Sequence, residues 1–148
     1  MDGIPASEVT AVVLNVTVTG PSRAGYLSLF PAGAAVPAVS NLKLSAGETV
    51  ANLVTVPVSA AGQLSFISHL ASGTVQVIAD LQGYYVEATS FGFGLYVPLS
   101  SPDRIADTRA GSGQPDAGQP LTSGSTTALT VTGGADGVPA GAVQSCSI

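Results

Sequence analysis

The chain has 148 residues, of which 45% are hydrophobic and only 9% are charged, and its formal net charge at pH 7 is −5. Four basic residues against nine acidic ones cannot build the cationic surface that binds a phosphate backbone, so the composition argues against nucleic acid as a partner. No run of 18 apolar residues is present, which argues against a membrane-spanning helix. Length and hydrophobic content favour one domain with one core.

Short strands joined by turns account for most of the sequence. Between residues 9 and 18, Val12, Leu14 and Val16 alternate with their neighbours, and this two-residue period is typical of a strand with one buried face. Eighteen glycines and ten prolines punctuate the β-branched stretches, as turn residues do. In chain order, strands are expected at residues 9–18, 26–30, 41–45, 50–58, 64–67, 74–81, 95–99 and 126–131.

The turns also suggest which strands are neighbours. A turn rich in Gly and Pro at 20–25 follows the first strand, so we expect the strands 9–18 and 26–30 to lie side by side. We expect the strands 64–67 and 74–81 to form another pair.

Three further features define the fold class. Pro57 has no backbone N–H to donate to a ladder, so it predicts a sheet edge or a bulge in its strand. Residues 111–125, rich in Gly, Pro, Ser and Asp, are expected to form a long surface loop. Helical apolar spacing is missing over any useful length. The sequence therefore predicts an all-β fold, an antiparallel β-sandwich of jelly-roll-like form or a barrel, with essentially no helix.

The two ends of the chain carry nearly the same pentapeptide. Asp-Gly-Ile-Pro-Ala at 2–6 returns as Asp-Gly-Val-Pro-Ala at 136–140, which indicates about one period of a tandem repeat. We therefore expect a single β domain over residues 1–148 that is a permuted repeat unit. Its residues 1–86 would be the back part of one module, and residues 91–143 the front part of the next.

The last residues break this repeat. An apolar strand follows residues 2–6, whereas residues 136–140 run into Gly-Ala-Val-Gln-Ser-Cys-Ser-Ile. Codons for the last six of these, read out of frame, permit Ala, Ile or Val, Val or Leu, Leu or Phe, and Asn. We therefore predict that residues 144–148 are a frameshifted tail, and we assign no role to the only cysteine, Cys146. Because another copy can supply the missing strand, the sequence predicts a homo-oligomer formed by strand exchange.

Six segments form a recognisable pattern: VVLNVTVTG at 12–20, GYLSLFPAG at 25–33, SNL at 40–42, ANLVTVPV at 51–58, ADLQGYY at 79–85 and DTR at 107–109. Together they resemble a tandem repeat of secreted actinobacterial proteins. The resemblance covers nearly the whole chain and implies a non-catalytic surface or wall-associated module, which occurs in tandem or beside peptidase, amidase or glycoside hydrolase domains. It also implies that the parent protein is extracellular or lies at the cell surface, although no secretory signal precedes residue 15.

The one concentration of charge lies at residues 102–109, which hold four of the thirteen charged residues: Asp103, Arg104, Asp107 and Arg109. Carboxylates and guanidinium groups within reach of each other form directional, often bidentate, hydrogen bonds. In a structural interpretation, these residues fix a loop or the junction between the two parts of the chain. In a functional interpretation, Asp103 and Asp107 accept hydrogen bonds from sugar hydroxyls or bind Ca²⁺. The spacing is not that of an EF-hand, and no other cofactor or metal site is predicted.

Aromatic residues are the second set of binding candidates. Partly exposed rings on a rigid sheet can stack on sugars, and Tyr26, Tyr84 and Tyr85 are the candidates for this role. Members of the core would show the same pattern. Trp, the commoner sugar-stacking residue, is absent. The full aromatic set considered is Tyr26, Tyr84, Tyr85, Tyr96, Phe30 and Phe91.

Two functions from different classes remain open. The first is a non-catalytic extracellular repeat module that binds polysaccharide or cell-wall glycan, or serves as an adhesion spacer. The alternative is a small hydrolase that acts on esters or glycosides through Asp103, Asp107 or His69, the only histidine. A Ser-His-Asp triad would also need an acid such as Asp80, and the chain lacks the Gly-x-Ser-x-Gly elbow.

Overall fold

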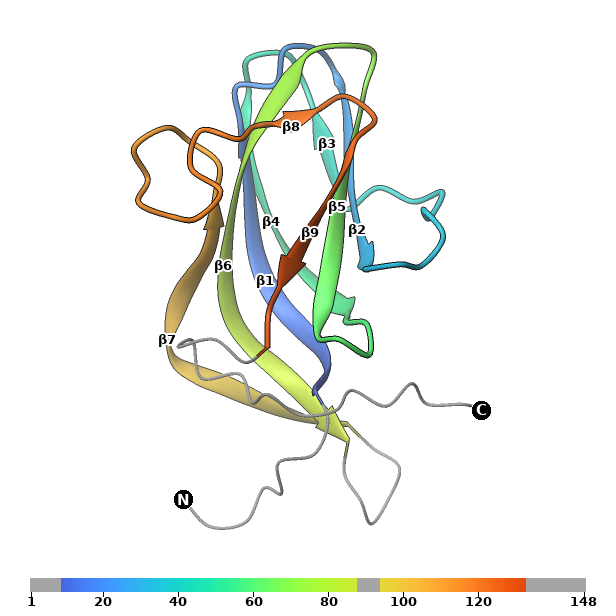
Figure 1. The fold of residues 1–148 in the computed structure, drawn as a ribbon, viewed down its shortest axis with the longest axis vertical. Coiled ribbons are helices and arrows are strands. Elements are labelled where there is room, and N and C mark those ends of the chain that lie inside the picture. The colour runs from blue at the N-terminus through green and yellow to red at the C-terminus, as the bar shows by residue number, and fades with distance from the viewer. Residues whose placement is uncertain (1–8, 88–93, 133–148) are drawn as a thin grey trace.

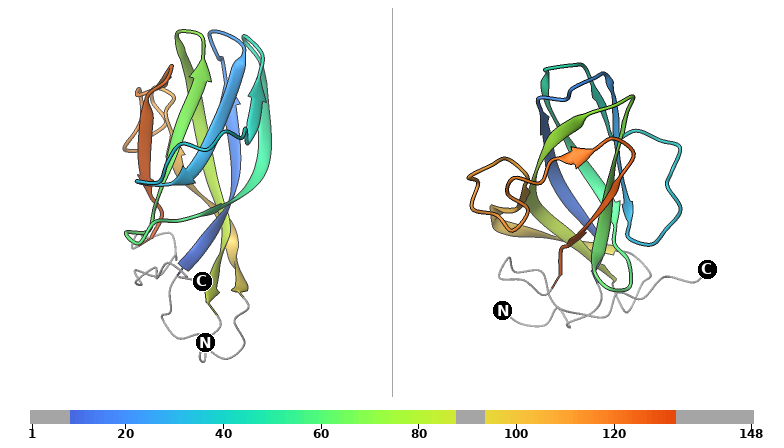
Figure 2. Two further views of the ribbon diagram at one scale, coloured as in Figure 1. Left: turned by 90° about the vertical axis from the view of Figure 1, so that its right-hand side faces the viewer. Right: turned by 45° about the horizontal axis from the view of Figure 1, so that its top comes forward.

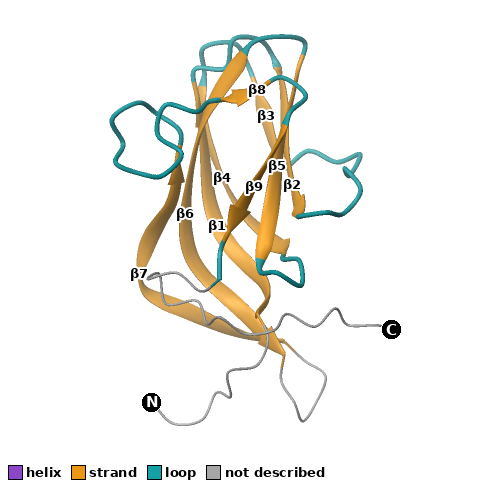
Figure 3. Cartoon of the chain, in the orientation of Figure 1, coloured by secondary structure: helices purple, strands orange, loops and turns teal. Residues whose placement is uncertain are grey.

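The structure is a computed structural model that describes residues 9–87 and 94–132. Both copies of the pentapeptide, Phe91 and the tail 144–148 lie outside the described residues. The described residues form strands and loops without a helix, as Figure 3 shows by colour, and so contain no helix that could cross a membrane. The strands are β1 (Val9–Thr19), β2 (Gly25–Pro31), β3 (Leu42–Leu44), β4 (Thr49–Pro57), β5 (Gln63–Leu70), β6 (Thr74–Glu87), β7 (Gly94–Asp107), β8 (Leu121–Thr122) and β9 (Thr126–Thr130).

These strands form two antiparallel sheets that pack face to face. One sheet has the order β4-β1-β6-β7, with β8 paired to the first residues of β6, and the other has the order β3-β2-β5-β9. The two layers can be followed in Figures 1 and 2. The fold is therefore an all-β sandwich. The alternative prediction of a barrel is wrong, because each sheet ends in its own edge strands.

Strands that follow each other in the sequence mostly lie in opposite sheets. β1 pairs with β4 and β6, whereas β2 belongs to the facing sheet, so the expected pairing of 9–18 with 26–30 is wrong. The expected pairing of 64–67 with 74–81 is wrong for the same reason, since β5 and β6 lie in different sheets. A connection between sheets lets two consecutive apolar faces cover each other, which a hairpin within one sheet cannot do.

One contiguous apolar core fills the space between the sheets. Val12, Leu14, Val16 and Val18 of β1 are fully buried, which confirms the alternation expected from the sequence. β4 is an edge strand, in agreement with the position of Pro57. The largest fully buried side chains come from both sheets and include Leu14, Leu27, Leu64 and Leu81.

Gly25 is required where β2 passes β5. A Cβ atom at this position would overlap the backbone oxygen of His69, which cannot swing aside as a flexible side chain would. We expect Gly25→Ala to lower the free energy of unfolding by about 3 kcal/mol, because it overpacks the contact between two paired strands. Urea denaturation measures the change. In the control, Gly94→Ala, the nearest atoms lie 3.7 Å from the new Cβ, so an equal loss there would contradict this explanation.

Candidate functional site

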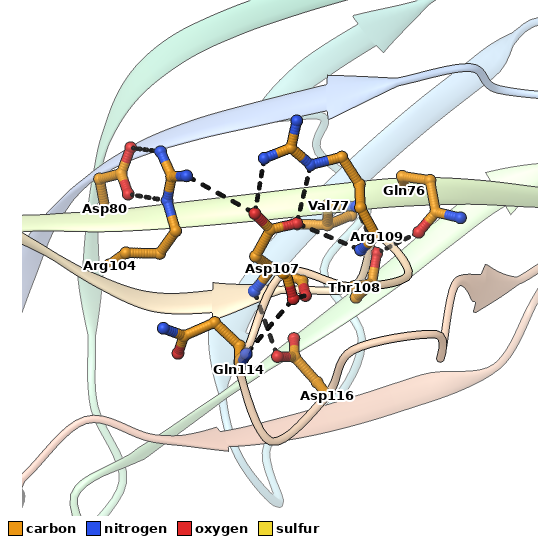
Figure 4. Close-up of polar contacts among 10 residues, drawn as sticks. Gln76, Val77, Asp80, Arg104, Asp107, Thr108, Arg109, Gln114 and Asp116 are labelled. Carbon is orange, nitrogen blue, oxygen red and sulfur yellow. Dashed lines mark hydrogen bonds and ion pairs between the residues drawn. The ribbon is translucent and has the colours of Figure 1, made fainter.

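Three of the four charged residues at 102–109, namely Arg104, Asp107 and Arg109, form a connected network with Asp80 of β6 (Figure 4). Asp107 lies at its centre, with its side chain only 2% exposed. Arg109 donates two parallel hydrogen bonds to it, from Nε to Oδ1 at 2.9 Å and from Nη2 to Oδ2 at 2.7 Å. The backbone N–H of Arg109 also donates to Oδ1, at 3.1 Å. The residues Asp80, Arg104, Asp107 and Arg109 are termed the charged network below.

Arg104 joins the two carboxylates of the charged network. Its Nε and Nη2 donate to Oδ1 and Oδ2 of Asp80 at 2.8 and 3.2 Å, and its Nη1 lies 3.5 Å from Oδ2 of Asp107. The antiparallel register of β6 and β7 places Arg104 directly opposite Asp80. Acidic and basic groups therefore alternate along the network, and each of its carboxylate oxygens has a guanidinium partner.

Backbone contacts around the charged network fix the long loop that follows β7. The N–H of Thr108 donates to the carbonyl of Val77 at 3.0 Å, and the N–H of Val77 donates to Oγ1 of Thr108 at 2.9 Å. The Thr108 hydroxyl thus continues the β6–β7 ladder beyond the end of the strand. Asp116 accepts the N–H of Asp107 at 3.2 Å, and Ser112 donates to the Asp107 carbonyl at 2.7 Å. These contacts favour the structural interpretation of the charged network.

The charges of the network change the acidity of its members. The pKa of Asp107 is lowered, first by the hydrogen bonds from the Arg109 side chain, while burial acts in the opposite direction. The backbone N–H of Arg109 and the positive charges of both arginines lower this pKa further. The pKa of Arg104 is raised, mainly by its hydrogen bonds to Asp80. Asp107 is therefore an ionised, fully partnered carboxylate, which is a poor general acid or nucleophile.

Tyr85 and Tyr96 form an aromatic pair on the solvent side of the sheet β4-β1-β6-β7. They lie opposite each other in β6 and β7, with ring centroids 5.3 Å apart and ring planes at 49°. The side chain of Tyr96 also covers Gly83, since a Cβ atom there would lie 2.5 Å from the Tyr96 hydroxyl oxygen and 2.7 Å from two of its ring carbons. Tyr96 is nevertheless 45% exposed. One part of the ring therefore rests on the Gly83 backbone while the rest faces solvent.

The aromatic pair and the charged network share one surface, the solvent side of the sheet β4-β1-β6-β7, termed the outer face. Strand register places a row of residues across it: Leu53, Asn15, Asp80 and Arg104. Leu53 is 62% exposed, and Asn15 is half-buried. Tyr85 lies five positions from Asp80 along β6, or roughly 15 Å at the rise of a strand. The outer face thus combines rings, paired charges and an amide on one rigid sheet.

His69 lies on the other sheet. In β5 its ring stacks on Tyr26 of β2, with centroids 4.2 Å apart and planes at 18°. Its Nε2 atom is buried and has no hydrogen-bond partner within the part of the chain that the structure describes. Asp103 and Asp107 belong to β7 of the facing sheet. The structure therefore does not bring together the three residues considered for a hydrolase.

Besides Tyr26, two predicted binding residues, Tyr84 and Asp103, belong neither to the charged network nor to the aromatic pair. Tyr84 points inward and packs in the apolar core, so its ring is not offered to a ligand. Asp103 lies opposite Leu81, half-buried, and forms no ion pair within residues 9–87 and 94–132. Over the same ranges, no three His, Cys, Asp or Glu side chains converge as metal ligands. The oxygens of Asp107, assigned to Ca²⁺ in one interpretation, face guanidinium groups.

A shallow hollow of about 270 Å³ lies between the loop after β7 and the edge strand β9. Apolar Ile105 and Leu129 line it together with polar Asp116, Gln119 and Thr130. Because β9 belongs to the facing sheet, this hollow is distinct from the outer face. Variants that change this hollow therefore serve as controls for ligand binding at the outer face.

Sequence reasoning missed the partners that lie outside residues 102–109. The alternation of the strand 74–81 predicts that Asp80 points outward, but no local sequence pattern predicts its ion pair with Arg104. Tyr96 belonged to the aromatic set without being singled out, and only its register with Tyr85 pairs the two rings. Asp116 sits in the long loop, where no periodicity exists to predict its position.

Replacing Asp107 by Asn is expected to lower the free energy of unfolding by about 2 kcal/mol, because charge-assisted hydrogen bonds to a buried carboxylate are lost. Asp103→Asn is the matched control, with the same chemical change in the same strand and an expected loss below about 0.5 kcal/mol. Urea denaturation followed by circular dichroism measures both variants. Equal losses would show that the charged network does not stabilise the fold.

The lowered pKa of Asp107 also sets the direction of a pH dependence. Because the pKa of the Asp107 carboxyl is lower in the folded protein than its ordinary value of 3.8, the unfolded chain binds a proton at this group more readily than the folded chain does. The stability that the ionised group contributes is therefore complete well above that value and is lost as the pH falls toward the lower folded pKa. The stability difference between the wild type and Asp107→Asn is expected to shrink from about pH 5 to about pH 2. A difference that grows over this interval contradicts the assignment.

Comparisons with known proteins bear on neither the fold nor the site. No protein-family model, no curated protein and no solved structure matches the chain. The roles of the charged network and of the outer face therefore follow from their own geometry and chemistry.

Proposed function

We propose that the chain is a non-catalytic β-sandwich module of an extracellular or cell-surface protein, and that its outer face binds polysaccharide or cell-wall glycan. The observation that carries this proposal is the aromatic pair of Tyr85 and Tyr96, set on the same rigid surface as the exposed side of the charged network. The resemblance to repeats of secreted actinobacterial proteins supports the location.

The aromatic pair supplies the apolar part of such a site. A sugar ring has a face of C–H groups that packs on an aromatic ring, and Tyr adds a hydroxyl that can exchange hydrogen bonds at its edge. Contact with Gly83 orients the Tyr96 ring before any ligand arrives, so little side-chain freedom is lost on binding.

Polar side chains farther along the outer face supply the specificity for particular sugars. Arg104 donates two hydrogen bonds to Asp80, yet its side chain remains 45% exposed and guanidinium carries further donors. The amide of Asn15 can both donate and accept, as sugar hydroxyls do. Because these groups lie roughly 15 Å from Tyr85 along the strand, the outer face suits an extended chain better than a single sugar.

The same geometry favours binding over catalysis. A glycosidase needs one carboxylic acid and one free carboxylate on either side of the bond that is cleaved. In the charged network, each carboxylate oxygen of Asp80 and Asp107 already accepts a hydrogen bond or contacts a guanidinium group. His69, the candidate base, stacks on Tyr26 in the facing sheet.

Tyr96→Ala is expected to weaken binding to insoluble polysaccharide about tenfold, because a stacking ring at the centre of a site contributes somewhat more than 1 kcal/mol. The measurement is depletion of the protein from solution by peptidoglycan, chitin, cellulose and xylan over a range of concentrations. Gly83→Ala should weaken binding as well, since its new methyl group displaces the Tyr96 ring. Gly94→Ala is its control.

Two further variants show whether the loss is specific to the outer face. Tyr26→Ala removes a ring from the other sheet, and Gln119→Ala changes the hollow beside β9. Both should bind as the wild type does, with thermal melts confirming that each variant is folded. Loss of binding in Gln119→Ala alone would move the site to the hollow. Release of soluble sugars by the wild type, abolished in Asp107→Asn, would instead favour the hydrolase.

A further inference from the structure

Residues 94–132 close the sandwich along one side. β7 and β8 pair with β6, and β9 pairs with β5, so this segment adds an edge strand to each of the two sheets. Within the described residues, its three strands pair with β5 and β6 and not with one another. Residues 94–132 are termed the closing segment and residues 9–87 the body. The body therefore provides every strand with which the strands of the closing segment pair.

The two ends of the closing segment each lie against the body. The first end pairs with the end of β6, where Glu87 lies opposite Gly94 and Val86 opposite Leu95. The second end lies against the turn at 58–62, at the lower end of the sandwich in Figure 1. There the N–H of Val58 donates to the carbonyl of Thr10 at 3.2 Å, and the N–H of Val131 donates to the carbonyl of Gly62 at 2.9 Å. The start of β1 and the end of β9 are therefore held by one turn.

In the sequence, the two copies of the pentapeptide flank the two strands that this turn holds. One copy, residues 2–6, precedes β1, and the other, residues 136–140, follows β9. A chain that ran from β9 through residues 133–140 and then through residues 7–8 into β1 would have ten connecting residues. Such a connector reaches up to about 33 Å, which is ample for two ends that contact the same turn.

We infer that the closing segment is exchangeable, so that the closing segment of one copy completes the body of another. Two linkers can join a closing segment to the body that it completes. One is the junction 88–93 of this chain, and the other is an Asp-Gly-x-Pro-Ala connector, which the repeat of the pentapeptide permits. When a body does not pair with its own closing segment, the edges of β5 and β6 are filled by the closing segment of a second copy of this chain, which places the same antiparallel strands there. This inference is independent of glycan binding by the outer face.

A circularly permuted variant tests the connector. In it, residues 94–140 come first and continue into residues 7–87, so that the chain is cut within 88–93 and closed through the pentapeptide. We expect a folded protein with the same β-sheet circular dichroism and a melting temperature within about 5 °C of the original chain. A permuted chain that is unfolded, or that lacks a cooperative melt, would overturn the inference.

A second variant tests exchange between copies. Paired residues such as Glu87 and Gly94 lie about 5 Å apart, whereas six prolines in place of residues 88–93 span roughly 19 Å as a stiff rod. The closing segment must then complete another copy, so we expect a dimer or larger closed assembly by sedimentation. The control replaces the same six residues by Gly-Ser-Gly-Ser-Gly-Ser and should stay monomeric. A folded monomer with prolines, a loss of the sandwich, or a control that also assembles would each count against exchange.

Discussion

Strand β6 is the element on which the other parts of this structure depend, because both its faces and both its edges are in use. Its inward side chains, Val75, Val77 and Leu81 among them, belong to the core. Its outward side chains include Asp80 and Tyr85, which bring the charged network and the aromatic pair onto one surface. One edge pairs with β1, and the other receives β7 and β8. An irregularity at Gln82, which has no partner in either neighbouring strand, shifts the side-chain alternation by one residue and so places Tyr85 on the same side as Asp80. Alternation on either side of Gln82 separates packing from surface chemistry.

The charged network shows how a buried carboxylate can be tolerated in a small β-sandwich. Burial alone would raise the pKa of Asp107 and favour its neutral form. The bidentate contact with Arg109 and the approach of Arg104 outweigh this effect, so the group stays ionised. Its hydrogen bonds in turn fix the loop between β7 and β8. Asp107, which looks catalytic in the sequence, is therefore held as a structural anchor, while its partners Arg104 and Arg109 remain about half exposed on the surface.

The separation of the two sheets also separates the candidate functions. The outer face carries paired charges, an amide and two rings, whereas the facing sheet carries His69 stacked on Tyr26. A hydrolase would need groups from both sides of a filled core to meet, while a binding surface needs only one side. The same two-layer plan underlies the proposed exchange, because the closing segment adds strands to one edge of each sheet and completes the core between them with Ala106, Leu121 and Val131.

Local periodicity accounts for what could be predicted from the sequence. The inward positions of β1 and of residues 75–81 in β6, the first residue of most strands and the edge position of Pro57 all follow from side-chain alternation and from the missing N–H of proline. The ends of the strands follow less well, because the strand expected at 95–99 runs on to Asp107 and β8 lies within the expected loop 111–125. The cluster at 102–109 was visible as a run of charges, but its link to Asp80 was not. Strand pairing and the contacts of Tyr96, Asp80 and Asp116 join residues distant in the chain, and no local pattern encodes them. Only the packing of two apolar sheet faces against each other decides which distant strands become neighbours.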